Sequence, residues 1–550
     1  MIPDPNLSWV KGAVDSPLLE ITIGQALDRA AEKWSDNDAL VSVGQDIRWS
    51  WSELALKADA MAAGLLALGL NRGDRIGIWS HNCAEWALTQ FAAARIGLIL
   101  TTINPAFRSS ELEFVLKKTG MKAVVAAERF RSSDYVTMLE ATESPELSHK
   151  IKIGGASREG WVQFDDVPAL ASGIERRRLQ EISASLDRND AINLQFTSGT
   201  TGSPKGATLS HRNILNNGWF VGQAQRLRPG DRICVPVPLY HCFGMVMGNL
   251  AAVTCGAAVV YPSTGFDPGA TLSAVEKERC TSLYGVPSMF IAELGHTDFE
   301  RFDLRSLRTG IMAGSPCPIE VMRKVVERMH MVDVTIAYGM TETSPVSFQS
   351  ELEDSLERRV ATIGKVQPHL EVKAIDTMGR ITPRGTPGEL CTRGYAVMLG
   401  YWDDPERTTE AIDDEGWMHT GDVGTIDGEG YGNIVGRIKD MVIRGGENIY
   451  PREIEEFLHA HPKISDVQVV GVPDPRFGEE ICAWIRLAPG ESCNEEEIRA
   501  FCRDRIAHFK IPRYVRFVEE FPLTVSGKVQ KFVIREAMAR ELNLVCATSA

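Results

Sequence analysis

The sequence predicts an α/β protein with a large N-terminal domain of parallel, helix-covered sheets, a small β unit, and a smaller, mobile α+β C-terminal domain. Its 550 residues exceed what one hydrophobic core organises. Short β-branched runs alternate with helical stretches, which is typical of parallel sheets covered by helices. After residue 394 the chain changes to short glycine-rich turns, which favour a small antiparallel unit.

The alternation of strands and helices begins in the first quarter of the chain. The run 75–79 precedes a helical stretch at 84–94, and the run 123–126 follows an amphipathic stretch at 111–118. Further apolar runs lie at 192–196, 233–237, 257–261, 282–284, 308–312 and 332–337. Ligands of open α/β sheets gather at the carboxyl ends of strands. We therefore expect the loops after Phe196, Met312 and Ala337 to face one cleft.

The last quarter of the chain has its own order of elements. The sequence predicts a proline-initiated amphipathic helix at 451–458, strands at 467–472 and 481–487, a helix at 495–506 and a strand at 514–518. Together they make a compact domain of about 110 residues. The segment 437–440 is polar and charged, which suits a hinge. We therefore divide the chain into domains at 1–438 and 439–550.

Composition and charge exclude several classes of function. The formal net charge of -14 argues against nucleic-acid binding, because neutralising phosphates requires a basic surface. Eleven cysteines without a Cys-x-x-Cys pair fit reduced thiols, and we expect Cys242 and Cys317 to be buried structural thiols. The most apolar stretch, 250–261, is too short for a transmembrane segment and predicts a buried helix end and strand. No secretory signal is visible, so we expect a cytoplasmic protein.

The most informative motif is the run 195–206, which reads Gln-Phe-Thr-Ser-Gly-Thr-Thr-Gly-Ser-Pro-Lys-Gly. Glycines let backbone N–H groups turn inward, hydroxyls can donate to oxyanions, and the lysine adds positive charge. The order differs from the P-loop pattern Gly-x-x-x-x-Gly-Lys, which disfavours a kinase or GTPase. A flexible surface loop is the structural alternative. The phosphate-binding candidates are Thr197, Ser198, Gly199, Thr200, Thr201, Gly202, Ser203 and Lys205.

Five further clusters follow in a fixed order. They are Met-Ala-Gly-Ser-Pro at 312–316, Tyr-Gly-Met-Thr-Glu-Thr at 338–343, Gly-Trp-Met-His-Thr-Gly-Asp-Val-Gly at 416–424, Gly-Arg-Ile-Lys-Asp at 436–440 with 445–451 behind it, and Pro-Leu-Thr-Val-Ser-Gly-Lys at 522–528. In this order and spacing the whole chain resembles the adenylate-forming superfamily, which includes acyl-CoA synthetases, aryl-CoA ligases, firefly luciferase and the adenylation domains of peptide synthetases. The runs 238–245 and 444–455 are most similar to acyl-CoA synthetases, particularly medium-chain fatty-acid ligases.

The resemblance implies a reaction in two steps. A carboxylate attacks the α-phosphorus of ATP to give an acyl adenylate and pyrophosphate, and the thiol of coenzyme A then displaces AMP. By the same resemblance Glu342 would hold Mg²⁺, Thr341 would bond the α-phosphate, and Lys528 would reach the α-phosphate and carboxylate oxygens. Taken singly, Glu342 and Lys528 would be an ordinary solvated acid and a surface lysine.

The resemblance also assigns residues to the nucleoside, coenzyme A and the hinge. Asp422 would accept the ribose hydroxyls with Arg437 beside the same sugar, and a structural ion pair between the two is the alternative. Tyr338 would offer a flat face to adenine, although core packing is the commoner fate of a tyrosine. Lys439 would be the hinge that swaps C-terminal faces between the steps. The other candidates are Gly314, Ser315 and Gly339 at the nucleotide, Gly445 and Gly446 at a pantetheine tunnel or in a plain tight turn, and His241 near the carboxylate in a positioning role.

The segments expected to line the acyl pocket are neutral and apolar. They favour a carboxylic acid with an apolar tail, because a buried charged tail needs a partner. Medium-chain, branched, aryl and polycyclic acids all satisfy this condition. The alternatives are an adenylation enzyme that loads a carrier-protein thiol, a nucleotide-binding regulator without turnover, and a kinase or hydrolase that releases ADP or phosphate; the sequence also leaves a homodimer open. The lining residues are Phe243, Met245, Val286, Met312 and Met340.

Overall fold

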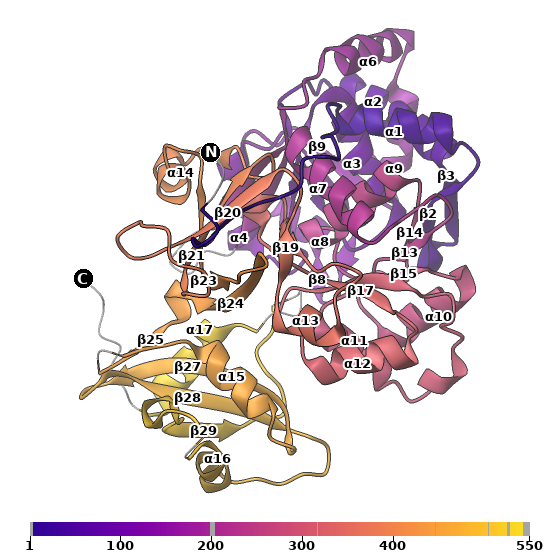
Figure 1. Ribbon diagram of the computed structural model, residues 1–550. Helices are drawn as coiled ribbons and strands as arrows, with labels where there is room; N and C mark the ends of the chain where they lie inside the picture. The colour runs from indigo at the N-terminus through magenta and orange to yellow at the C-terminus, as the bar shows by residue number, and fades with distance from the viewer. Residues whose placement is uncertain are drawn as a thin grey trace. The chain divides into compact units, whose positions relative to one another are not determined.

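The chain folds into two compact units, which the computed structural model describes over residues 4–197, 204–315, 317–445, 447–503, 505–524 and 529–542 (Figure 1). The larger unit contains Val10–Val372 and Thr392–His419. The smaller unit contains Met1–Trp9, Lys373–Cys391 and Thr420–Ala550. The α/β class predicted from the sequence is confirmed.

One sheet of the larger unit has eight strands in the order β10-β9-β6-β4-β5-β11-β12-β22. The strands from β10 to β11 run parallel, whereas β12 pairs antiparallel with both β11 and β22. Their bounds are β4 Arg75–Trp79, β5 Ile99–Thr102, β6 Ala123–Ala127, β9 His149–Ile153, β10 Val162–Gln163, β11 Ala191–Thr197, β12 Lys205–Ser210 and β22 Gly400–Tyr401. The runs 75–79, 123–126 and 192–196 are therefore strands of this sheet, as predicted.

A second sheet of the larger unit has the strand order β19-β18-β17-β16-β15-β13-β14-β2-β3. The strands from β17 to β2 are parallel, and antiparallel strands flank this parallel run on both sides. The bounds are β2 Asp38–Ser42, β3 Ile47–Ser50, β13 Arg232–Cys234, β14 Ala258–Tyr261, β15 Ser282–Gly285, β16 Thr309–Ala313, β17 Asp333–Gly339, β18 Val346–Gln349 and β19 Gly364–Val366. The strand expected at 233–237 stops at Cys234, because Pro236 has no N–H to donate to a ladder.

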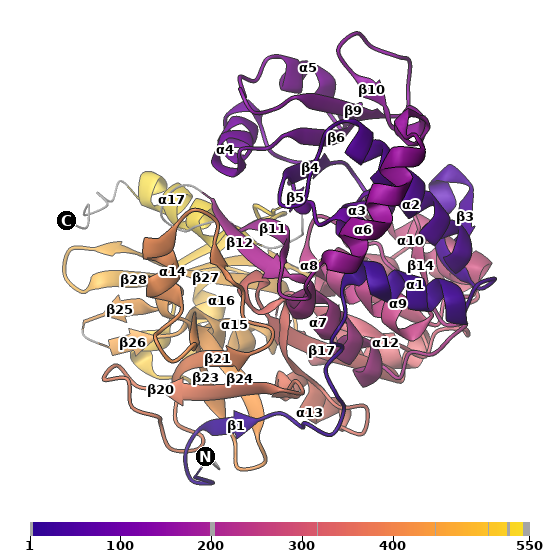
Figure 2. The same ribbon diagram turned by 90° about the horizontal axis from the view of Figure 1, so that it is seen from above.

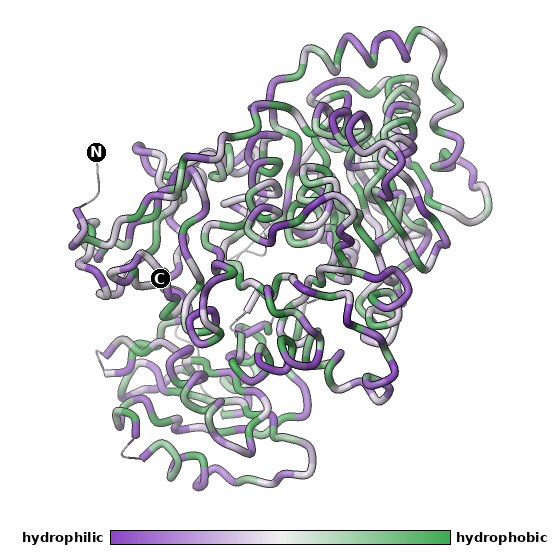
Figure 3. Tube along the Cα trace, turned by 45° about the vertical axis from the view of Figure 1, so that its right-hand side comes forward, coloured by the Kyte–Doolittle hydropathy of each residue, from purple (hydrophilic) through white to green (hydrophobic). Residues whose placement is uncertain are grey.

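Helices pack on both faces of these sheets (Figures 1 and 2). The largest core combines side chains of both sheets with α1 Ile23–Lys33, α2 Trp51–Ala67, α3 Ala84–Ile96 and α7 His211–Ala224. A second core lies under α10 Pro268–Glu278, α11 Pro287–Leu294, α12 Ile319–Arg328 and α13 Leu356–Ala361, and a third under α4 Ser109–Thr119 and α5 Tyr135–Glu140. The side chains of these cores are apolar, and apolar residues are green in Figure 3.

Shorter helices complete the larger unit. They are α6 Gly173–Ser185, α8 Cys242–Gly244, α9 Ala251–Cys255 and α14 Pro405–Ala411. The apolar stretch 250–261 forms α9 and β14 and is buried, as expected. Over the part of the chain that the structure describes, every helix is too short or too polar to cross a membrane.

The smaller unit holds a sheet in the order β26-β25-β28-β27, with β29 parallel to β28. Its elements are β25 Val442–Arg444, β26 Glu447–Ile449, α15 Pro451–His459, β27 Ile464–Asp474, β28 Gly478–Leu487, α16 Glu495–Cys502, β29 Tyr514–Phe517 and α17 Lys531–Glu541. The predicted order of elements is confirmed. The helix expected to reach 506 ends at Cys502, because the backbone of Arg503 leaves the helical range (φ −58°, ψ 137°). A second group of strands, β20 Leu370–Ile375, β21 Gly388–Gly394, β23 Met418–Ile426 and β24 Tyr431–Arg437, includes the antiparallel pair β23–β24 expected after residue 394.

Candidate active site

The glycine-rich run joins two antiparallel strands. β11 ends at Thr197 and β12 begins at Lys205, directly opposite in the register, and Figure 2 shows the two strands side by side. The candidates Ser198, Gly199, Thr200, Thr201, Gly202 and Ser203 lie outside the described residues. In a P-loop, by contrast, the glycines lead into a helix whose N-terminus faces the phosphates. The ammonium of Lys205, at the start of β12, supplies a positive charge at this end of the strand pair.

Glu342 lies at the carboxyl end of β17 in a single turn, Thr341–Thr343. It is 5% exposed, so the alternative of a solvated acid is wrong. The hydroxyl of Tyr401 donates to its Oε1 at 2.9 Å, and the hydroxyl of Thr197 donates to the same oxygen at 3.4 Å. Across the described residues no lysine, arginine or histidine forms an ion pair with this carboxylate. A buried anion that only hydroxyls contact fits a site for a cation.

Tyr401 connects Glu342 with the glycine-rich hairpin. It belongs to β22, where it pairs with Ala207 of β12. The ammonium of Lys205 lies 4.9 Å from the centre of its ring, which is within the range of a cation–π contact. Burial and the negative charge of Glu342 raise the pKa of the Tyr401 hydroxyl, so it stays a hydrogen-bond donor. Thr197, Lys205, Glu342 and Tyr401 therefore form one cluster, called the Glu342 cluster below.

The expected convergence of strand ends is found in the larger unit. Thr197 is the last residue of β11 and Glu342 follows β17, and their contact joins the ends of the two sheets. Ala313 at the end of β16 pairs with Ala337 of β17, so Gly314 and Ser315 begin beside the same edge. All three predicted loops thus start in one region.

Three residues proposed for the nucleotide lie next to Glu342. Tyr338 is half-buried with its ring 6.2 Å from that of Phe348, and Thr341 is half-buried in the same turn as Glu342. Gly339 is exposed, and a Cβ added to it would collide with the carbonyl oxygen of Pro345. The turn that carries Glu342 therefore needs glycine at this position.

His241 caps a helix that contains a π-helical stretch, Met245–Leu250. His241 is half-buried, with its ring 4.5 Å from that of Tyr240. The side-chain amide of Gln90 donates to the carbonyl of Met245 at 3.3 Å and accepts from Asn249 at 2.8 Å. π-helical turns are frequent at functional sites, and here a buried amide network supports one.

The predicted acyl-pocket residues are all neutral, and all but one of them lie in the same core. The ring of Phe243 stacks on Tyr284 at 5.7 Å, and Met245, Val286 and Met340 belong to the same core. Met312 lies instead in the core under α10 to α13. Because side chains alternate along β16, Met312 points to the opposite face from Ile311 and Ala313, and its assignment to this wall is wrong.

The two cysteines near the motifs differ. Cys242 is buried as predicted and donates to Oε1 of Gln195 at 3.2 Å, and burial raises the pKa of its thiol. Cys317 is only half-buried, contrary to the prediction, because it lies in the connection between β16 and α12, where it packs against the core under α10 to α13 without being enclosed by it. None of the ten cysteines of the described residues forms a disulfide.

The smaller unit carries the remaining candidates. Asp422 and Arg437 lie opposite each other on β23 and β24, and their ion pair has an Nε–Oδ1 distance of 2.8 Å. The structural ion pair that the sequence left as an alternative is therefore present. Lys439 is exposed in the single turn Ile438–Asp440. Gly445 has φ +60° in the tight turn from β25 to β26. Gly446 and Lys528 lie outside the described residues.

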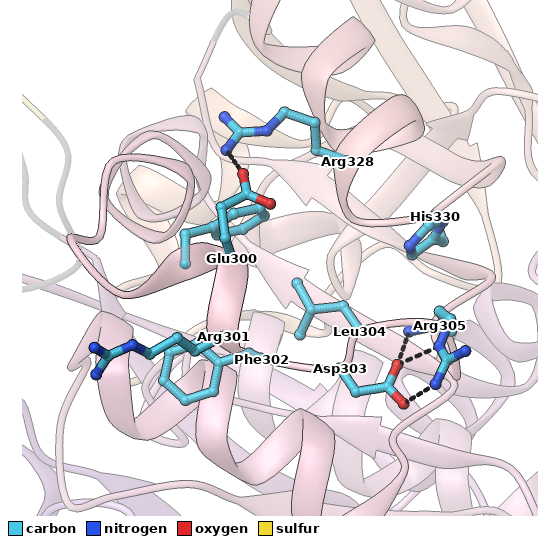
Figure 4. Close-up of a pocket in the computed structure, with 9 residues that line it drawn as sticks. Glu300, Arg301, Phe302, Asp303, Leu304, Arg305, Arg328 and His330 are labelled. Carbon is cyan, nitrogen blue, oxygen red and sulfur yellow. Dashed lines mark hydrogen bonds and ion pairs between the residues drawn. The ribbon is translucent and has the colours of Figure 1, made fainter.

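A hollow of about 340 Å³ lies elsewhere on the larger unit, lined by residues 299–305, Arg328 and His330 (Figure 4). Four of its charged side chains form two ion pairs. Arg328 pairs with Glu300 at 2.6 Å, and Arg305 donates three hydrogen bonds to Asp303, two from its guanidinium and one from its backbone amide. It contains none of the predicted site residues.

Tyr401 is the member of the Glu342 cluster that sequence reasoning missed. It is separated from Glu342 by 59 positions and follows no spacing rule that links a phenol to a carboxylate. The sequence offered one local signal, the pair Gly400-Tyr401. A glycine followed by a tyrosine marks a turn more often than a functional site.

Comparison with known proteins agrees with this geometry. The AMP-binding enzyme family matches residues 27–402, and the AMP-binding enzyme C-terminal domain matches residues 453–528. A mitochondrial medium-chain acyl-CoA ligase from Danio rerio is 47% identical over 99% of this chain and 92% of its own length. The Homo sapiens ligase of that name is 44% identical over 98% of this chain and 91% of its own length.

Solved structures agree as well. An anthranilate CoA ligase in complex with anthranoyl-AMP superposes with a TM-score of 0.87 at 26% identity, covering 96% of this chain and 99% of its own. ATP-bound MatB from Rhodopseudomonas palustris gives 0.82 at 28% identity, covering 94% and 99%. The chain is therefore a member of the adenylate-forming family of AMP-binding enzymes, in its acyl-CoA synthetase group.

Proposed function

We propose that this acyl-CoA synthetase acts on carboxylic acids with an apolar tail, of medium chain length, branched or ring-bearing. The acid's carboxylate attacks the α-phosphorus of ATP and pyrophosphate leaves. The sulfur of coenzyme A then attacks the acyl carbonyl, its proton is released, and AMP leaves. The observation that carries the proposal is the buried Glu342, held by two hydroxyls beside Lys205 at the meeting point of the strand ends.

The Glu342 cluster suits the first step because two anions must approach each other there. Lys205 would neutralise phosphate oxygens, and Thr197 and Thr341 would donate hydrogen bonds to them. Glu342 would hold Mg²⁺, which neutralises charge on the phosphates when bound. Positioning and charge neutralisation account for most of the catalysis expected at such a centre.

The apolar wall supports the class of substrate. Phe243, Met245, Val286 and Met340 share one core without a charged member at these four positions. The relatives' name, medium-chain acyl-CoA ligase, points to the same class. His241 would stand near the carboxylate as a positioning residue.

The nucleoside sites and the C-terminal domain are part of the same proposal. Tyr338, Gly314, Ser315 and Gly339 would contact adenine, and Asp422 and Arg437 would contact the ribose. The domains would be 1–438 and 439–550, with Lys439 as hinge, Lys528 acting in adenylation, and the Gly445–Gly446 turn acting at the pantetheine. We retain the cytoplasm as the predicted compartment, although the animal relatives are named as mitochondrial.

The first test measures pyrophosphate and AMP release with Mg-ATP. The acids would be of 4 to 16 carbons, branched, aryl or steroid-like, each with and without coenzyme A. We expect acid-dependent pyrophosphate release and turnover that requires coenzyme A, with apolar acids preferred over dicarboxylic and amino acids.

Other outcomes would change the assignment. In one of them, a pantetheinylated carrier protein stimulates the release of pyrophosphate and AMP where coenzyme A does not. That result would identify an adenylation enzyme that loads carrier proteins. ADP in place of AMP would contradict adenylate formation. No pyrophosphate with any acid would favour a nucleotide-binding regulator.

A further inference from the structure

The hydroxyl of Tyr401 is one of two groups that fix the carboxylate of Glu342. It donates to Oε1 at 2.9 Å, which is the shorter of the two hydroxyl contacts to that oxygen. Among the described residues, no hydrogen bond reaches Oε2. One oxygen of the carboxylate is therefore fixed by the protein, and the other is left for a ligand.

The phenol itself is held firmly in place. The amide of Tyr401 donates to the hydroxyl of Thr408 at 2.9 Å, and the next residue, Trp402, donates its amide to the carbonyl of Gly206 at 2.7 Å. The side chain is 8% exposed. These hydrogen bonds fix the backbone of Tyr401 against β12, and burial of the ring restricts the rotamers from which its hydroxyl reaches Glu342.

The backbone of Glu342 is also held by a hydrogen bond. The amide of Met398 donates to the carbonyl of Glu342 at 2.9 Å, three residues before Tyr401. The segment that leads into β22 therefore contacts both ends of the glutamate. Such double support is typical of the groups that orient a metal-binding side chain.

We propose that Tyr401 is a positioning residue that aligns Glu342 for Mg²⁺ and so couples magnesium binding to ATP binding. The inference rests on the proposed role of Glu342 as the magnesium ligand. Core packing alone would require the ring of Tyr401 but not its hydroxyl. The two explanations therefore separate in Tyr401→Phe, which keeps the ring beneath Lys205.

The test measures equilibrium binding of ATP to the full chain without acid or coenzyme A. The dissociation constant is determined in EDTA and in excess Mg²⁺, and the ratio of the two gives the contribution of the cation. We expect Tyr401→Phe to bind ATP in EDTA within twofold of the wild type and to lose about tenfold of the Mg²⁺-dependent affinity, as for a hydrogen bond to a charged group.

Tyr395→Phe is the matched control, because Tyr395 is also 8% exposed and lies in the same segment of chain without a hydrogen bond to Glu342. It should keep the wild-type ratio. Both dissociation constants are measured on the same preparation. A fraction of unfolded protein therefore affects both measurements equally and leaves their ratio unchanged.

Glu342→Gln separates the two ways in which the inference can fail. If Glu342→Gln loses the Mg²⁺ effect and Tyr401→Phe keeps it, the positioning role is overturned and the proposed function stands. If Glu342→Gln also keeps it, Glu342 is not the magnesium ligand, and both the proposed metal role and this inference are overturned.

Discussion

Two buried glutamates show how differently one residue type is accommodated in this molecule. Glu342 has two hydroxyl donors at the site. Glu293, on α11, is 1% exposed, and neither of its carboxyl oxygens has a hydrogen-bond partner among the described residues. Burial raises the pKa of Glu293 well above its ordinary value of 4.5. The folded state therefore favours the neutral form of Glu293, and ionisation of this carboxyl destabilises the fold.

The first prediction at this scale is that Glu293→Met stabilises the protein. An unpaired buried polar group costs about 1–3 kcal/mol, and methionine fills similar space without one. In the wild type the folded state binds the proton more tightly than the unfolded chain. The contribution of Glu293 to stability is therefore greatest below pH 4.5 and falls as the pH rises from there toward the pKa of the folded state.

Urea unfolding of both proteins at pH 5 and pH 7.5 measures this effect. The advantage of Glu293→Met should be larger at pH 7.5. An equal advantage at both pH values would mean that the carboxyl does not titrate differently in the folded and unfolded states. Glu300→Met, which alters an exposed acid, serves as the control and should show neither effect.

At the scale of elements, local sequence pattern explains most of the sheet and little of the cluster at its edge. The β-branched runs at 75–79, 282–284 and 308–312 lie in strands, because a strand buried on both faces has to be apolar throughout. The strand predicted at 233–237 is shorter than expected, because Pro236 cannot donate a ladder hydrogen bond although its four neighbours in the run are apolar. Met312 was misplaced because motif membership says nothing about which face a strand residue occupies. Tyr401 could not be found, since its contact with Glu342 depends on the pairing of β22 with β12.

Gly339 ends β17 immediately before the turn that carries Glu342, and it yields a prediction for that element. In Gly339→Ala the new methyl group meets the carbonyl of Pro345, and the turn must shift. Overpacking of this kind costs about 1–3 kcal/mol. Since Glu342 moves with the turn, we expect acid-dependent pyrophosphate release to fall by tenfold or more.

Gly44→Ala provides the comparison, because no atom lies within 4 Å of the added carbon. It should alter stability by less than about 0.5 kcal/mol and leave the rate unchanged. A Gly339→Ala enzyme with the wild-type rate would show that the turn tolerates displacement and that its geometry is not critical.

At the scale of the whole molecule, the ordered motifs predict that the two units contribute different residues to the two steps of the reaction. The Glu342 cluster lies in the larger unit, whereas Lys528 and the Gly445–Gly446 turn belong to the smaller one. If the two steps use different faces of the smaller unit, substitutions there should affect the steps separately.

Lys528→Ala tests this separation. Adenylate formation should fall by about a hundredfold or more, as when one donor to a developing charge is removed. Thioester formation from supplied acyl adenylate and coenzyme A should change little. Lys531→Ala, which removes the ion pair with Glu455, is the control and should affect both half-reactions alike. An equal loss of both steps in Lys528→Ala would contradict the two-face mechanism.

The burial of the cysteines has a consequence for chemical self-protection. The enzyme makes a mixed anhydride that any thiolate could intercept, and its own chain carries eleven thiols. In the described part, all but Cys317 and Cys493 are buried, and burial raises the pKa of Cys242 close to the site. A protonated, enclosed thiol is a poor nucleophile. The fold thus favours the thiol of the co-substrate over its own and guards the enzyme against acylating itself.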